Sequence, residues 1–109
     1  MTTRDQLASQ ISGDKFPALR AFLRGYLHED VADEYGTAVE AVEQFCEDAD
    51  AHERKTVAAE WLEFVEKTHG LPLRDINQLL ARKLGGAYLV ASEDELQKIT
   101  DLFRQRCRK

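Results

Sequence analysis

The sequence has few of the features that mark secreted, membrane or redox proteins. No apolar run approaches the roughly 20 residues that a membrane-spanning helix needs. The first residues, MTTRDQLASQISGDKF, contain no apolar segment of the signal-peptide type. There are two cysteines, Cys46 and Cys107, whereas a secreted disulfide scaffold usually has more, at closer spacing. They form no Cys-x-x-Cys motif, which argues against a redox site and against a zinc site. We therefore expect a cytoplasmic protein with two reduced thiols.

The motifs of common catalytic sites are also missing. There is no nucleophile elbow and no Gly-rich phosphate loop. His28 and Glu29 begin like a metal-binding His-Glu-x-x-His helix, but no histidine follows four residues after His28. The side chains of neighbouring residues on a helix, such as Glu29 and Asp30, point about 100° apart and would not bind one metal ion together. We expect a protein that is not an enzyme and has no cofactor and no metal.

Length and composition favour one folded domain. The chain has 109 residues, of which 43% are hydrophobic and 32% are charged. A chain of this size can bury a core without metal or disulfide support. Residues 1–109 are therefore predicted to form a single helical domain.

Apolar residues recur almost everywhere with helical spacing. A weak pattern at Leu7 and Ile11 is followed by Pro17, which suits the first turn of a helix. The clearest stripe has i, i+3, i+4, i+7, i+8 spacing and consists of Leu19, Phe22, Leu23, Tyr26 and Leu27. Later stripes consist of Val39, Val42, Phe45, Cys46 and Ala49; Val57, Trp61, Phe64 and Val65; Leu73, Ile76, Leu79, Leu80 and Leu84; and Leu96, Ile99 and Phe103. The pattern predicts an all-α, compact bundle of five to six helices.

Capping signals divide these stripes. Thr37 to Glu40 and Ser92 to Glu95 both read as capping boxes, and Asp50 suits the start of a further helix. The run Ala87 to Ala91, AYLVA, is strand-like and short, and is either an edge strand or an extended connector. Trp61 is predicted to fill the core, and the Tyr26 hydroxyl to find a polar partner.

The net charge of −5 conceals a strong asymmetry. From Glu29 to Glu66 there are 13 acidic residues against Arg54 and Lys55, a net charge of −11. The rest of the chain carries a net charge of +6, without the interleaved aromatics of a nucleic-acid interface. Such a field repels nucleic acid from the middle of the chain and attracts basic partners. We expect a protein partner, with no role for nucleic acid or a membrane.

One stretch carries a family resemblance. The segment FPALRAFLRGYLHED, followed by EYGTAVEAVEQF, resembles small bacterial immunity proteins of contact-dependent growth inhibition systems. The matching positions are Phe16, Leu19, Phe22, Leu23, Tyr26, His28, Asp30, Ala41, Val42 and Phe45. The last third departs from the family, because LGGAYLVASEDEL lacks the cysteine and the proline that members often have there.

The resemblance implies a partner and a mode of action. Such proteins bind the toxic C-terminal domain of a delivered effector and block it by stoichiometric occlusion. Many of these toxins are nucleases, which tend to be basic because their substrate is a polyanion. The clustered acidic residues then become the candidate contact surface. The expected toxin-binding residues are Glu29, Asp30, Asp33, Glu34 and Tyr35, with Glu43, Glu47 and Asp48.

Two other interpretations stay open at this point. The first is a small hydrolase that uses His28 with Asp30 or Glu34. The second is a helical adaptor or oligomeric scaffold without a toxin partner. His28 and Asp30 also suit a turn contact that positions the loop between two helices. For the immunity protein itself we expect a monomer or a weak homodimer.

Overall fold

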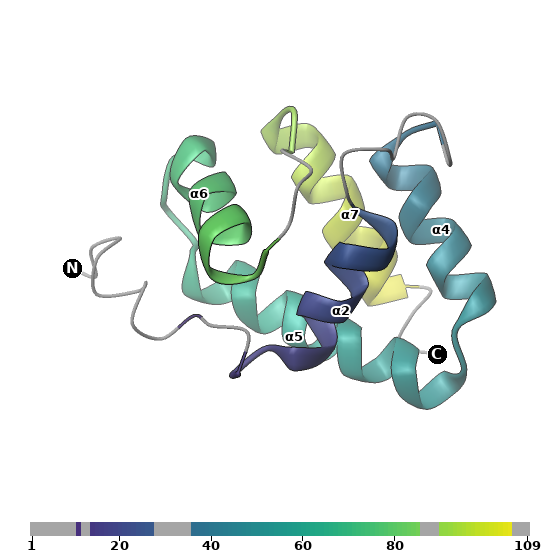
Figure 1. Ribbon diagram of the computed structural model, residues 1–109. Coiled ribbons are helices and arrows are strands. Elements are labelled where there is room, and N and C mark those ends of the chain that lie inside the picture. Colours follow the sequence, from purple (N-terminus) through teal and green to yellow (C-terminus); the bar gives the residue numbers. More distant parts are fainter. Residues whose placement is uncertain (1–10, 12–13, 28–35, 86–89, 106–109) are drawn as a thin grey trace.

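Helices form where apolar residues recur with helical spacing. The computed structural model describes residue 11 and residues 14–27, 36–85 and 90–105. Its helices are α2 (Pro17–Tyr26), α4 (Ala38–Asp48), α5 (Ala51–Lys67), α6 (Leu73–Lys83) and α7 (Glu93–Gln105) (Figure 1). The described part of the chain contains no strand, so the predicted all-α fold is confirmed. None of its helices is long and apolar enough to cross a membrane.

The predicted caps of α4 and α5 are present. The Glu40 amide donates to Thr37 Oγ1 at 3.1 Å, and the Glu53 amide donates to Asp50 Oδ1 at 2.8 Å. Gly36 has a φ of +94°, which an L side chain rarely adopts, and the Glu40 carboxylate lies over it. These contacts satisfy amides that the first turn of each helix leaves without an intrahelical partner.

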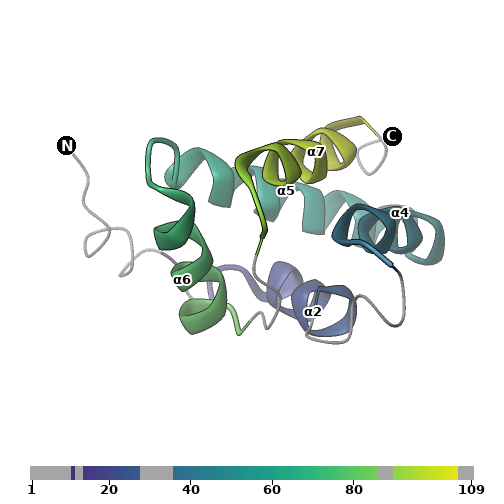
Figure 2. The same cartoon turned by 90° about the horizontal axis from the view of Figure 1, so that it is seen from above.

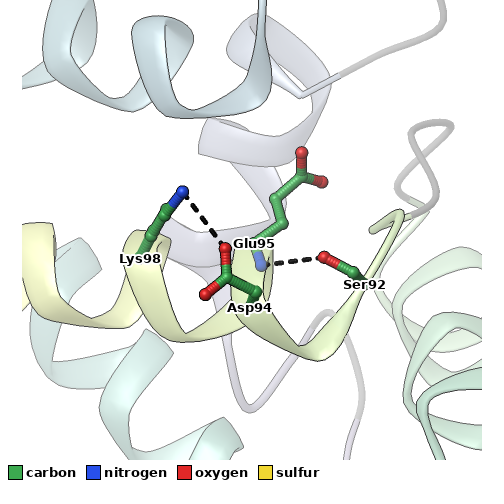
Figure 3. A network of polar contacts seen from close by, with 4 residues as sticks. All are labelled: Ser92, Asp94, Glu95 and Lys98. Carbon is green, nitrogen blue, oxygen red and sulfur yellow. Dashed lines mark hydrogen bonds and ion pairs between the residues drawn. The ribbon is translucent and has the colours of Figure 1, made fainter.

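The cap of α7 is also confirmed (Figure 3). The Glu95 amide donates to Ser92 Oγ at 3.1 Å. The Glu95 carboxylate accepts from the Ala91 amide at 3.1 Å, one residue before the position expected for an ideal capping box. An exposed ion pair of 3.1 Å joins Lys98 to Asp94 on the next turn. An exposed i, i+4 pair contributes only about 0.3–0.5 kcal/mol.

Helix α2 starts differently, because its cap comes from another helix. Phe16 occupies the N-cap position without a side-chain cap bond, and Pro17 follows it. The Leu19 amide donates instead to Glu60 Oε1 of α5 at 3.0 Å. A carboxylate at this end also interacts favourably with the helix dipole. The start of α2 is thus tied to the middle of α5.

The helices pack around α5, which is the longest of the described helices. It contacts α2 on one side and α7 on another, and α4 contacts α7. In both views α4 and α6 lie toward opposite ends of the molecule (Figures 1 and 2). The apolar stripes of all these helices meet in one core, with nearly complete burial of their large side chains. Tyr26, Val65 and Leu96 are only partly buried at its margin.

Aromatic rings form the centre of this core. Phe103 of α7 lies 5.5 Å from Phe22 and 5.6 Å from Trp61, measured between ring centroids. Trp61 is fully buried, and its Nε1 donates to Thr100 Oγ1 at 3.0 Å. The prediction that Trp61 fills the core is confirmed. The hydroxyl of Thr100 donates in turn to the Leu96 carbonyl, so this buried polar pair is satisfied.

The connector before α7 is held by a side chain of α6. Asn77 donates to the Val90 carbonyl at 3.0 Å and accepts from the Val90 amide at 2.9 Å. Val90 and Ala91 are not in a strand. Residues 87–89 of the strand-like run lie outside the described residues. An amide side chain thus satisfies the backbone groups that a strand partner would otherwise take.

Cys46 corrects one expectation. Its sulfur atom is part of a disulfide, so the prediction of two reduced thiols is wrong for this residue. Cys46 is almost fully buried on the inner face of α4. The sequence argument rested on spacing and on compartment, and spacing alone does not show which cysteines come together in a fold. Cys107 and the predicted helix near Leu7 lie outside the described residues.

Candidate functional site

The outer face of α4 concentrates negative charge. The helix contains four acidic residues and no basic residue. Glu40, Glu43 and Glu47 follow i, i+3, i+7 spacing and therefore share one side of the helix. Glu40 and Glu47 are exposed, and Glu43 is half-buried. With Asp48, these residues form what we call the acidic face.

The opposite side of α4 fixes this face in place. Its buried residues, Ala38, Ala41, Val42, Phe45 and Cys46, belong to the core. At the end of the helix, Arg54 Nη1 donates to the Ala49 carbonyl at 2.9 Å and to the Cys46 carbonyl at 3.2 Å. A guanidinium at this position satisfies terminal carbonyls and complements the negative end of the helix dipole. The acidic face is thus presented on a helix capped at both ends.

Asp48 has structural partners. The Tyr26 hydroxyl donates to Asp48 Oδ2 at 3.2 Å, and Gln44 Nε2 donates to Asp48 Oδ1 at 2.8 Å. The prediction that the Tyr26 hydroxyl finds a polar partner is confirmed. Asp48 remains exposed despite both bonds. It therefore joins the acidic face to the aromatic residues of α2.

Charge is distributed unevenly between the ends of the molecule. Helix α6, at the end opposite α4, carries Arg74, Arg82 and Lys83 against Asp75 (Figure 2). Helix α2 adds two arginines and no acidic residue. Helices α4 and α6 thus carry net charges of opposite sign at opposite ends of the molecule. A field of this form orients a charged partner before contact.

The structure places three of the eight expected toxin-binding residues. Glu43, Glu47 and Asp48 come together on α4. The other five, Glu29, Asp30, Asp33, Glu34 and Tyr35, lie outside the described residues. Whether any of the eight contacts a toxin stays a prediction. Two neighbours were not among the expected toxin-binding residues. Glu40 was predicted only to cap a helix, and Tyr26 was predicted only to lie on an apolar stripe with its hydroxyl bonded to a polar group.

The hydrolase interpretation gains no support from the described residues. His28, Asp30 and Glu34 lie outside them. His52 lies in the first turn of the 17-residue helix α5, which is about 25 Å long, and His69 follows the other end of this helix. The two histidines therefore cannot share a site. Within the described ranges, no group of three or more His, Cys, Asp or Glu residues is arranged to hold a metal ion.

Comparison with known proteins decides the family. The family described as CdiI immunity protein matches residues 15–95. The chain belongs to this family. The match runs from the residue before Phe16 to the first turn of α7, so it extends well beyond the Phe16 to Phe45 stretch and includes the segment LGGAYLVASEDEL, where the resemblance is weaker. No curated protein and no solved structure matches the chain significantly.

The acidic face lies in the part of the chain that matches the CdiI immunity family. The family name denotes proteins that protect against a toxin, and α2, α4, α5 and α6 all lie within the matched residues. The acidic face is therefore part of the matched region.

Proposed function

We propose that this protein neutralises a cognate toxin domain by binding it one to one and covering a surface that the toxin needs. The observation that carries this proposal is the family match over residues 15–95. The action requires no catalysis and no cofactor, because occlusion depends only on complementary surfaces. A nuclease is the toxin class that best suits an acidic inhibitor, since nucleases present basic surfaces to their substrate.

The acidic face supports a basic partner. Four carboxylates on a helix without a basic residue attract a basic surface and disfavour acidic competitors. An 11-residue helix is about 16 Å long and about 10 Å wide, and its outer side is much smaller than the roughly 800 Å² that each partner buries in a stable complex. Neighbouring segments must contribute the rest. The stretch Glu29 to Tyr35 precedes α4 in the chain and is the contribution that we propose.

The cytoplasmic location expected from the sequence belongs to the same proposal. The disulfide of Cys46 is an observation against it, because disulfides are rare in reducing compartments. Fractionation of producing cells, with the Cys46 thiol trapped by alkylation during lysis, tests both points together. A cytoplasmic protein with a labelled Cys46 thiol would show that the bond does not form in the cell.

The test of the proposal is co-expression with the toxin domain encoded immediately upstream. We expect a soluble complex that elutes as one species, with the mass of one copy of each chain. Cells that produce the toxin domain should grow only when this protein is present. A toxin domain from an unrelated effector serves as the control and should neither bind nor be neutralised.

Two outcomes would overturn the proposal. One is the absence of any complex between the two purified chains, together with unprotected growth. The other is a homo-oligomer that ignores the toxin domain, which would favour the adaptor or scaffold interpretation. The mass of the protein alone, measured in the same experiment, also tests the expected monomer or weak homodimer.

A further inference from the structure

A small pocket lies between α2, α4 and α5, beside the acidic face. It is open to solvent and has a volume of about 250 Å³. Its lining includes Ala21, Phe22, Tyr26, Phe45, Glu53 and Val57. Pockets that hold whole small-molecule ligands are usually larger, about 300–1,000 Å³. We call this pocket the aromatic groove; its size suits a single side chain.

The wall of the aromatic groove consists of packed aromatic rings. The Tyr26 ring stacks on Phe22 at 5.7 Å with 14° between the planes, and meets Phe45 edge-on at 5.3 Å. Phe22 and Phe45 are buried, whereas Tyr26 is half-buried. The bond from its hydroxyl to Asp48 fixes the exposed edge of the ring. Binding at such a wall loses little side-chain entropy, which is why rigid aromatic residues often dominate interfaces.

The rim of the aromatic groove is acidic. Glu53, in the first turn of α5, lines it, and Asp48 is bonded to the tyrosine that forms its wall. Both carboxylates are on exposed residues. An apolar interior with a negative rim matches a side chain with an aliphatic stem and a cationic end. Lysine and arginine have this form, and their charges also interact favourably with a tyrosine ring.

We propose that the aromatic groove is the anchor point for one lysine or arginine side chain of the toxin domain. This inference rests on the proposed function and names the contact through which it acts. The stem lies against Tyr26 and Val57, and the cation is paired with Glu53. The acidic face beside it supplies the long-range attraction, and the aromatic groove supplies the close contact that slows dissociation.

The first test fills the aromatic groove. Ala21→Trp places a large side chain in its lining, and Ala81→Trp makes the same change on α6, where the residue is also exposed. The dissociation constant for the upstream-encoded toxin domain is measured by calorimetry for both variants and for the wild type. We expect A21W to weaken binding by about 30-fold or more, as loss of an interface hot spot does, and A81W to leave it unchanged.

The second test identifies the side chain that occupies the aromatic groove. Each lysine and arginine of the toxin domain is replaced by alanine and measured against wild type and against Glu53→Gln. One of these positions should couple to Glu53 by about tenfold or more, as close charge pairs at interfaces do. Glu66→Gln, an exposed change near the other end of α5, should couple to none of them.

The outcomes separate this inference from the proposed function. If the wild type binds the toxin domain and A21W binds equally well, the aromatic groove is not the anchor and the proposed function stands. If A21W weakens binding but no basic toxin residue couples to Glu53, the occupant is not a cation and the inference is overturned. If the wild type does not bind the toxin domain at all, both fail.

Discussion

At the scale of single residues, the Trp61–Thr100 contact shows how a polar group enters an aromatic core. The position of Trp61 on an apolar stripe predicted its burial, but gave no sign of the partner for its indole N–H. That partner is a buried threonine 39 positions later on α7. Thr100 has one hydroxyl that accepts from Trp61 and donates to the Leu96 carbonyl. Both groups are satisfied, as buried polar groups in native proteins usually are.

The substitution Thr100→Val tests how much this hydrogen bond contributes to stability. Valine keeps the shape of threonine but cannot accept a hydrogen bond, which leaves the Trp61 N–H buried without a partner. We expect the free energy of unfolding to fall by about 1–3 kcal/mol. Urea denaturation measures it as a lower midpoint with an unchanged slope.

The same substitution in a Trp61→Phe background is the matched control. Phenylalanine has no indole N–H, so removal of the Thr100 hydroxyl should then cost clearly less. If Thr100→Val lowered the free energy of unfolding equally in the two backgrounds, the Trp61–Thr100 hydrogen bond would make no specific contribution to stability. A double-mutant cycle of this kind isolates the pairwise contribution.

At the scale of elements, the helix starts divide into two groups. Helices α4, α5 and α7 are capped by Thr37, Asp50 and Ser92, each three residues before the amide it accepts from. These caps are local, and the sequence predicts them. Helix α2 is capped by Glu60, 41 positions away from Leu19. No local pattern could predict this cap, because it exists only when α2 lies against α5.

Glu60→Ala should therefore destabilise the protein through the start of α2. Loss of a helix cap costs about 0.5–2 kcal/mol, and we expect a decrease of about 1 kcal/mol in the free energy of unfolding. Glu60→Gln keeps an oxygen acceptor for the Leu19 amide and should cost less. Both are measured by chemical denaturation.

Glu63→Ala is the control for this prediction. Glu63 is exposed on the same helix, and its replacement should change stability by less than about 0.5 kcal/mol. If the alanine variants at positions 60 and 63 were equally stable, the tertiary cap would not contribute.

At the scale of the whole molecule, we expect the separation of charge between α4 and α6 to influence association with the toxin domain. The acidic face lies at one end and the basic residues of α6 at the other (Figure 1). Attraction between exposed charges acts over about 10 Å at moderate ionic strength. The position of an acidic residue should then matter more than the total number of charges.

Charge reversal at matched positions tests this idea. Glu47→Lys places a cation on the acidic face, and Glu66→Lys makes the same change in net charge at the far end of α5. At low salt we expect E47K to slow association with the toxin domain by about threefold or more, and E66K to slow it less. Stopped-flow kinetics over a salt series measures both. Identical rate constants for the two variants would show that only net charge matters.

Most of the helices and their ends could be predicted from the sequence because their signals are local. Apolar spacing along one helix and caps within three residues depend on neighbours in the chain. The sequence also determined that negative charge gathers in the middle of the chain. The stretch from Phe16 to Phe45 pointed to the immunity family that the comparison established.

Only the tertiary structure decided which faces meet. The Glu60 cap, the Trp61–Thr100 bond and the aromatic groove beside Tyr26 depend on contacts between helices. Their partners lie far apart in the chain, and helical spacing does not encode which stripes pack together. The sequence therefore determined which helices form and which charges they carry, while packing around α5 decided where those charges lie in space and which aromatic edge stays open beside them.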